Sequence, residues 1–191
     1  MSAKDKIIAL PNPHLRQKSR RIPVVTPEVH DVIKEMIDAT VDWEDSREHE
    51  VGVALAAVQI DKPYRIIIVR NDFENKADKT FSVFVNPEIV KFEGQKEEDY
   101  EGCLSVTDIY GKVPRYTKVR IRALDETGQV VRVKVEGFLA RIFQHEIDHT
   151  NGVMFVDHLK DHQDAFYKLS QDGKLEPLAY EEVLKENVFE D

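Results

Sequence analysis

The first regular pattern along the chain is an amphipathic helical repeat. Thr26 and Pro27 supply a hydroxyl at the N-cap and a proline at the first helical position, where a helix commonly begins. Apolar residues then recur at spacings of three and four, at Val29, Val32, Ile33, Met36, Ile37 and Val41. These residues share one face, so the spacing predicts an N-terminal helix that packs against a core. The acidic segment 42–50 is expected to be a loop.

Four later segments have the pattern of strands. Segments 64–70 and 81–85 are rich in β-branched and aromatic residues and are bounded by turn-forming residues. Segments 117–124 and 129–135 alternate apolar and polar residues and are joined by an Asp-Glu-Thr-Gly turn, which predicts a hairpin.

A second long helix is predicted over 138–150. This segment contains no glycine or proline, and Asn151 and Gly152 supply a C-terminal stop. Strands therefore precede a helix without regular alternation of strand and helix. That order indicates an α+β fold with a mostly antiparallel sheet.

Composition narrows the class of protein. Hydrophobic residues make up 41% and charged residues 33% of the 191 residues, as in a folded chain of one domain and a tail. The net charge of −9 argues against DNA as a partner. No apolar stretch approaches the roughly 20 residues of a membrane span, and the N-terminus lacks the features of a secretory signal. A cytoplasmic location without membrane association is expected.

Candidate chemistry lies in the second predicted helix, at His-Glu-Ile-Asp-His over 145–149. This matches H-E-x-x-H, in which two histidines four residues apart can share one metal ion and the glutamate can act as a general base. Phe138 and Ile142 lie within about 60° of both histidines on a helical wheel, so an apolar wall borders the pair. The alternative is an ordinary helix whose histidines only cap or form hydrogen bonds.

A metal site of this kind needs a third protein ligand. Metzincins would have histidine where this chain has Phe155, so that class is excluded. The single cysteine, Cys103, excludes an intramolecular disulfide and is the favoured ligand, since thiolates bind iron and zinc strongly. A buried structural thiol is the alternative for Cys103. A carboxylate ligand, as in gluzincins, is the alternative for the metal, with candidates at Glu176, Glu181 and Glu182.

Three ordered motifs resemble those of the peptide deformylases. They are Gly-Val-Ala-Leu-Ala-Ala-Val-Gln over 52–59, Glu-Gly-Cys-Leu-Ser over 101–105 and Gln-His-Glu-Ile-Asp-His over 144–149. The family patterns are GxGLAAxQ, EGCLS and QHExDH, and the last two match in full. The resemblance covers about residues 7–160. It implies a domain over 1–160, with mostly antiparallel sheets around a central metal-binding H-E-x-x-H helix. Residues 161–191 form an acidic C-terminal extension, expected to be helical in part.

The resemblance also implies an activity and a catalytic set. The family removes the N-formyl group from nascent polypeptides that begin with formylmethionine and releases formate. Carried onto this chain, one divalent metal ion is held by Cys103, His145 and His149. The metal would be Fe²⁺, with Zn²⁺, Ni²⁺ or Co²⁺ able to substitute. Glu146 would move the proton, while the Gln59 amide and the Leu104 backbone N–H would face the oxyanion.

Substrate contacts follow from the same resemblance. The methionine side chain would lie on Phe138, Ile142 and Val53. The peptide backbone would pair with Gly102 and the extended segment that includes Gly52 and Val53. An ion pair between Asp148 and Arg115 is expected beside the metal-binding face of the helix, with Arg141 as the alternative partner of Asp148.

Two departures from the family pattern bear on substrate preference. Ala54 replaces the second glycine of the first motif, and Tyr110 stands where some deformylases carry an arginine.

The predicted partners are N-formyl-methionyl nascent peptides, with transient ribosome contact. A zincin-like metallopeptidase and a catalytically silent paralogue that binds nascent chains or ribosomes remain the rival functions.

Overall fold

The computed structural model describes residues 2–189 as a mixture of helices and antiparallel strands. None of the helices in this range has the length and apolar character needed to cross a membrane. The helices are α1 (Pro27–Asp45), α2 (Gly137–Thr150) and α3 (Tyr180–Lys185). The strands are β1 (Ala54–Ala56), β2 (Ile66–Arg70), β3 (Phe81–Cys103), β4 (Val106–Leu124), β5 (Val130–Glu136), β6 (Phe166–Leu169) and β7 (Leu175–Pro177).

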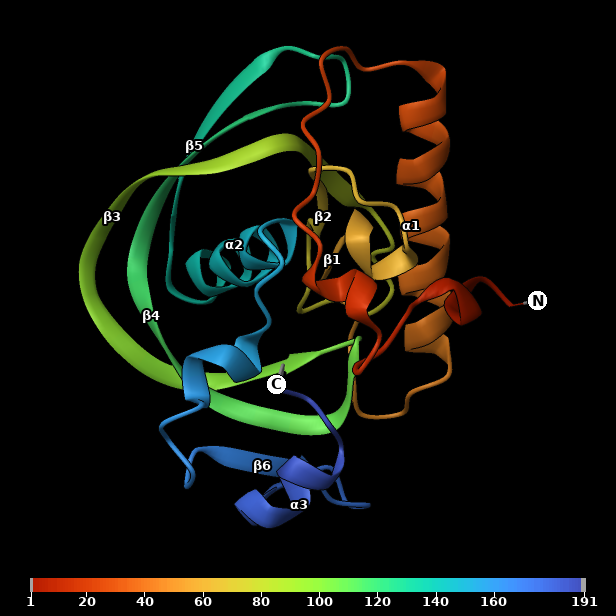
Figure 1. Ribbon diagram of the computed structural model, residues 1–191. Helices are drawn as coiled ribbons and strands as arrows, with labels where there is room; N and C mark the ends of the chain where they lie inside the picture. The colour runs from red at the N-terminus through yellow and green to blue at the C-terminus, as the bar shows by residue number, and fades with distance from the viewer. Residues whose placement is uncertain (1, 190–191) are drawn as a thin grey trace.

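The strands form one antiparallel sheet that is organised by β4. Strands β1, β2, β3 and β4 pair in that order, and the far edge of β4 pairs with two different strands. Its residues 118–124 pair with β5, and its residues 109–111 pair with β6, which in turn pairs with β7. Figure 1 shows the long strands β3 and β4 curving around α2.

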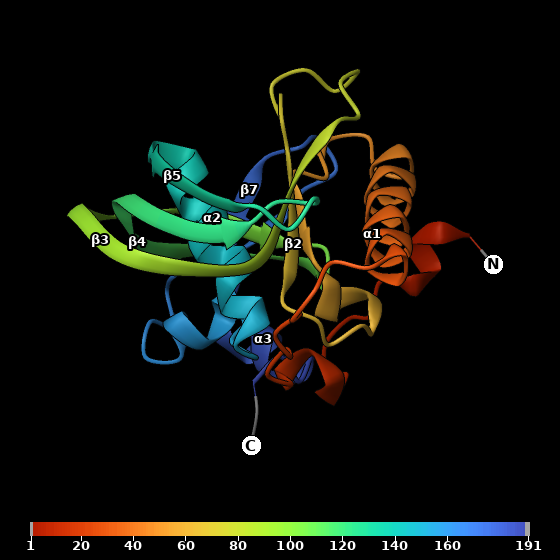
Figure 2. The same cartoon turned by 90° about the horizontal axis from the view of Figure 1, so that it is seen from above.

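Strand β2 is buried on both faces and separates two apolar clusters. Ile66 and Ile68 pack in the cluster that contains the buried face of α1, whereas Ile67 and Val69 pack in the cluster that contains α2. Alternate side chains of a strand point to opposite faces, so a run of apolar residues can serve both clusters. Figure 2 shows α1 and α2 on the two sides of β2.

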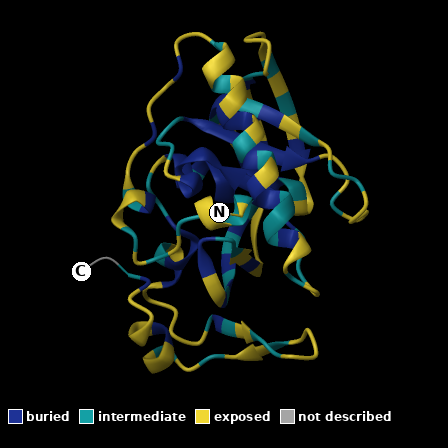
Figure 3. Cartoon of the chain, turned by 90° about the vertical axis from the view of Figure 1, so that its right-hand side faces the viewer, coloured by how far each residue is buried: buried dark blue, intermediate teal, exposed yellow. Residues whose placement is uncertain are grey.

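A third apolar cluster joins the C-terminal segment to the body of the chain. Phe166, Val183 and Val188 are buried in it beside Leu15 and Phe155. In Figure 3 this segment carries both buried and exposed residues. The C-terminal segment therefore contributes to a shared core, while the proposed domain boundary at residue 160 stays a prediction.

Both long predicted helices and the predicted hairpin are confirmed, but the boundaries of α1, β3 and β4 differ from the prediction. Helix α1 continues to Asp45, so it includes the first part of the expected acidic loop. Strands β3 and β4 are much longer than the predicted segments 81–85 and 117–124. The expected break at Asn86 is a bulge: Asn86 has φ of 53° and its side chain bonds both backbone groups of Ile22. The strand therefore bends there and continues.

Candidate active site

Helix α2 brings His145, Glu146 and His149 to one buried place. The helix follows β5 directly, and Gly137 makes the junction with φ of 61°, which favours a residue without Cβ. Residues four apart share a face of a helix, so the two imidazoles lie together, with their ring centroids 4.7 Å apart. All three side chains are buried.

Cys103, at the end of β3, completes a cluster with the two histidines. The ligand atoms of Cys103, His145 and His149 all lie within 4.8 Å of one another. The Nε2 atoms of the histidines are 3.1 Å apart, and the Cys103 Sγ is 3.3 Å from the Nε2 of His149. Atoms that bind one ion at about 2.0–2.3 Å must themselves lie about 3–4 Å apart. The thiol and the imidazoles therefore fit a shared transition-metal ion.

The three carboxylates that the sequence offered as alternative third ligands are not part of this cluster. Glu176, Glu181 and Glu182 are exposed, and among residues 2–189 the group that could hold a metal is the cysteine and the two histidines. The described geometry therefore favours the thiolate as third ligand over a gluzincin-like carboxylate.

Glu101 is the residue that the sequence reasoning gave no role, and it orients one side of the cluster. Its Oε2 lies 2.9 Å from the Nδ1 of His145, and both oxygens accept hydrogen bonds from Arg115, at 2.9 and 3.1 Å. Burial raises the pKa of Glu101, but His145 and Arg115 outweigh it and hold the pKa well below the usual range. A carboxylate on the second nitrogen of a histidine fixes the ring for metal binding through the first.

A short ion-pair network continues from Glu101 to the outside of α2. The Nη1 of Arg115 donates to Asp148 at 2.6 Å, and His158 contacts the same Asp148 oxygen at 2.8 Å. Arg141, the alternative partner of Asp148, donates instead to Glu101 at 2.9 Å. Glu101 therefore receives two guanidinium groups and one imidazole, and Arg115 joins both carboxylates.

Loss of Arg115 should destabilise the fold more than loss of Asp148. Arg115→Ala leaves two carboxylates, one of them buried, without this cation, which should cost about 3 kcal/mol or more. Asp148→Ala leaves Arg115 paired with Glu101, so we expect a cost nearer about 1 kcal/mol. Urea unfolding of both variants measures the difference. Equal, negligible losses would show that the network does not support the fold.

Glu146 and Gln59 lie beside this cluster and line the same cavity. Burial raises the pKa of Glu146 to about 7, and its Oε2 has no hydrogen-bond partner among the described residues. Gln59 accepts the N–H of Ala56 through Oε1, so its Nε2 points away from that strand, 3.4 Å from the Cys103 Sγ and 3.1 Å from the Ser105 Oγ. A carboxyl whose pKa is raised to about 7 and an amide N–H donor that bonds Cys103 and Ser105 therefore flank the cluster.

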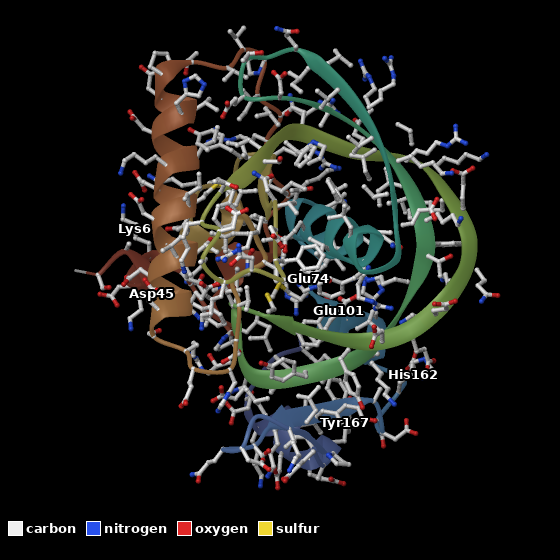
Figure 4. The ribbon with its side chains drawn as sticks, turned by 180° about the vertical axis from the view of Figure 1, so that it is seen from behind. Lys6, Asp45, Glu74, Glu101, His162 and Tyr167 are labelled. Carbon is white, nitrogen blue, oxygen red and sulfur yellow. The ribbon has the colours of Figure 1, made fainter. Side chains whose placement is uncertain are left out.

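A cavity of about 370 Å³ opens beside this cluster. Figure 4 shows Glu101 beside α2, at the inner side of the curved sheet. The predicted substrate residues that line the cavity are Val53, Gly102, Phe138 and Ile142. The predicted catalytic and metal-ligating residues that line it are Gln59, Cys103, Leu104, His145 and Glu146. Phe138 is 47% exposed and packs edge-on against Phe73.

Gly52 departs from the expectation, because its backbone is already engaged. Its N–H donates to Glu44 at 2.9 Å and its carbonyl accepts from Arg70 at 3.1 Å. Glu44 and Arg70 form a fully buried ion pair of 2.6 Å. Both backbone polar groups of Gly52 are therefore bonded within the fold, where they hold the segment that carries Val53 at the cavity.

The two departures from the family motif have distinct surroundings. Ala54 is buried, faces the α2 cluster and lines the cavity, whereas Leu55 faces the α1 cluster. Tyr110 packs on Gly102, where an added Cβ would lie 2.5 Å from the tyrosine ring. Its hydroxyl donates to Glu50 at 2.7 Å. The Tyr110 to Glu50 contact was not foreseen from the sequence, because it joins residues 60 apart.

Comparison with known proteins places this geometry in a family. The family described as polypeptide deformylase matches residues 4–165. The peptide deformylase of Psychrobacter arcticus is 41% identical over 153 residues, which are 80% of this chain and 78% of that protein. A crystal structure of a peptide deformylase from Legionella pneumophila superimposes with a TM-score of 0.71 at 38% identity, covering 81% and 85% of the two chains. One from Synechococcus elongatus in complex with actinonin gives a TM-score of 0.74 at 31% identity, covering 82% and 80%.

Proposed function

The chain belongs to the peptide deformylase family, and we propose that it hydrolyses the formyl group of N-formyl-methionyl nascent peptides at Cys103, His145 and His149. In this reaction water adds to the formyl carbon and the carbon–nitrogen bond breaks, which gives formate and a free methionine amine. The observation that carries the proposal is the thiol and two imidazoles gathered within 4.8 Å at a cavity that also holds an unpartnered carboxyl.

A divalent metal ion belongs to the proposed site. When bound, it would lower the pKa of a water molecule and polarise the formyl carbonyl. One thiolate and two imidazoles suit several first-row metals, and we propose Fe²⁺ as the native ion, with Zn²⁺, Ni²⁺ or Co²⁺ as substitutes. Metal analysis of protein purified without oxygen tests the identity of the ion.

Glu146 supplies the proposed proton transfer. Its buried carboxyl, with a pKa raised to about 7, can accept a proton from the attacking water and give it to the departing amine nitrogen. Glu146 is not a metal ligand in this proposal, because His145 and His149 of the same helix fill that role together with Cys103.

Gln59 and Leu104 stabilise the oxyanion in this proposal. The Gln59 amide is held by the Ala56 N–H, so its donor stays near Cys103 without substrate. The backbone N–H of Leu104 follows Cys103 directly and is the second donor. Each donor of this kind contributes about 3 kcal/mol to transition-state stability.

Substrate recognition is proposed to use the apolar stripe of α2. The methionine side chain would lie on Phe138 and Ile142 and against Val53, all of which line the cavity. The peptide backbone would pair with Gly102 and with the segment at Val53. In this proposal the protein acts in the cytoplasm on nascent chains. Transient contact with the ribosome stays a prediction.

Mass spectrometry of the products distinguishes this function from its rivals. A formyl-Met-Ala-Ser peptide should lose the mass of one CO and keep all its backbone bonds. Backbone cleavage would instead support the zincin-like peptidase. A metal-loaded protein that binds the peptide and leaves its mass unchanged would support the silent paralogue.

A further inference from the structure

Part of the cavity lining comes from residues that lie beyond those matched by the family. Leu169 and Leu175, from β6 and β7, and Gly173, from the turn between them, line the same cavity as Cys103 and Glu146. The family match ends at residue 165. The hairpin 166–177 therefore lies outside the residues matched by the family, and it reaches the proposed active site.

Pairing and packing hold this hairpin in place. Gly111 and Tyr110 of β4 pair with Phe166 and Tyr167, so β6 continues the sheet past the strand that carries Tyr110. Phe166 is fully buried in the third apolar cluster. Tyr167, on the other face, packs edge-on against Tyr100 with ring centroids 4.8 Å apart. Strand β4 therefore lies between β6, which carries Tyr167, and β3, which carries Glu101, and both residues are labelled in Figure 4.

Strand alternation turns two leucines toward the cavity. Leu169 pairs with Leu175, and directly paired residues of antiparallel strands point to the same face. Leu169 lies two residues from Tyr167 and so shares the face opposite Phe166. Both leucines are only half-buried, and both line the cavity. They present apolar surface that no other side chain fully covers.

The rim of the cavity that adjoins the hairpin carries two aromatic rings. Trp43 and His49 line it, and Gly173 packs so closely on the His49 ring that an added Cβ would lie 3.3 Å away. Glu50 has one oxygen bonded to Tyr110 and the other 3.4 Å from Arg47. An acidic side chain placed here would meet leucine and an already paired carboxylate, so its burial would be unfavourable.

We propose that the hairpin 166–177 forms a specificity subsite that favours a large apolar or aromatic side chain in the residues after the formylmethionine. The proposal rests on the proposed deformylase function, because that function puts the methionine side chain on the separate Phe138 and Ile142 stripe. A peptide held in extended form advances about 3.3 Å per residue, so its later residues must pass along the remaining walls of the cavity.

Two peptide series test the subsite with metal-loaded protein. In formyl-Met-X-Ser and formyl-Met-Ala-X, X is Ala, Leu, Phe or Asp, and kcat/KM is measured for each. We expect wild type to favour Leu or Phe over Asp by about tenfold or more in one series. Leu175→Ala and Leu169→Ala should each reduce that preference severalfold through KM. Leu184→Ala, on the exposed face of α3 and 49% exposed, should keep it. An unaltered preference in both hairpin variants would overturn the proposal.

Binding measured without catalysis separates this proposal from the proposed function. Trp43 is the only tryptophan and lines the cavity, so its fluorescence reports binding of the deformylated peptides Met-X-Ser and Met-Ala-X. If wild type releases no formate, the deformylase proposal fails. The subsite proposal then stands only if apolar X binds tighter in wild type than in Leu175→Ala. Equal affinities in the two proteins would contradict it.

Discussion

Glu146→Gln should lower turnover by at least about 100-fold while leaving the metal content of the protein unchanged. Glutamine has nearly the same shape as the glutamate but cannot accept a proton from water or pass it to the leaving amine. The residue is buried beside the cavity, and its Oε2 has no partner among the described residues, so the substitution breaks no described contact of that atom.

Parallel measurements of kcat and metal stoichiometry test this expectation. Glu181→Gln, which changes an exposed residue of α3, is the matched control and should keep both values near wild type. Full activity of Glu146→Gln after reconstitution would remove Glu146 from the mechanism. Loss of metal in this variant would indicate that the carboxylate is itself a ligand.

Cys103→Ala should abolish both tight metal binding and activity. The substitution leaves two imidazoles, and a site with three protein ligands loses most of its affinity when the thiolate is removed. Because Cys103 is the only cysteine, its reactivity also reports on the wild-type site directly. A thiol reagent should modify the metal-free protein and spare the metal-loaded protein.

Two results would contradict the role of Cys103. One is a Cys103→Ala variant that retains stoichiometric, tightly bound metal, which would favour a carboxylate ligand. The other is equal reactivity of the thiol with and without metal. Thiol titration does not depend on catalysis, so it separates a failure of metal binding from a failure of the chemical step.

Much of the fold follows from local patterns, and the differences have local causes. The stripe from Val29 to Val41 predicts α1, and the alternation on both sides of the 125–128 turn predicts β5 and the part of β4 that pairs with it. The length of β3 could not be predicted from the sequence, because Asn86 interrupts the run of strand-forming residues. Its positive φ and its bonds to Ile22 create a bulge that depends on a segment 64 residues away. The short strands of the C-terminal hairpin gave no periodicity long enough to recognise.

Some residues of the candidate site could likewise be predicted from the sequence, and others could not. The spacing of His145 and His149 and the single thiol are visible in the sequence, because helix geometry and residue chemistry are local. The role of Glu101 is not visible in the sequence, because it depends on Arg115 and Arg141, which β4 and α2 bring to it. Gly52 was assigned to substrate because its motif is adjacent to Val53, but the buried pair of Glu44 and Arg70 occupies its backbone.

Formate release from formyl-Met-Ala-Ser is the most direct test of the central claim. The assay is run without oxygen on protein loaded with Fe²⁺, Zn²⁺, Ni²⁺ or Co²⁺, beside metal-stripped protein and Glu146→Gln. We predict that metal-loaded wild type releases one formate for each new methionine amine, with the peptide backbone intact, and that both comparison samples are nearly inactive. Stoichiometric metal bound through Cys103 with no formate released, or formate released equally well by stripped protein, would contradict the account.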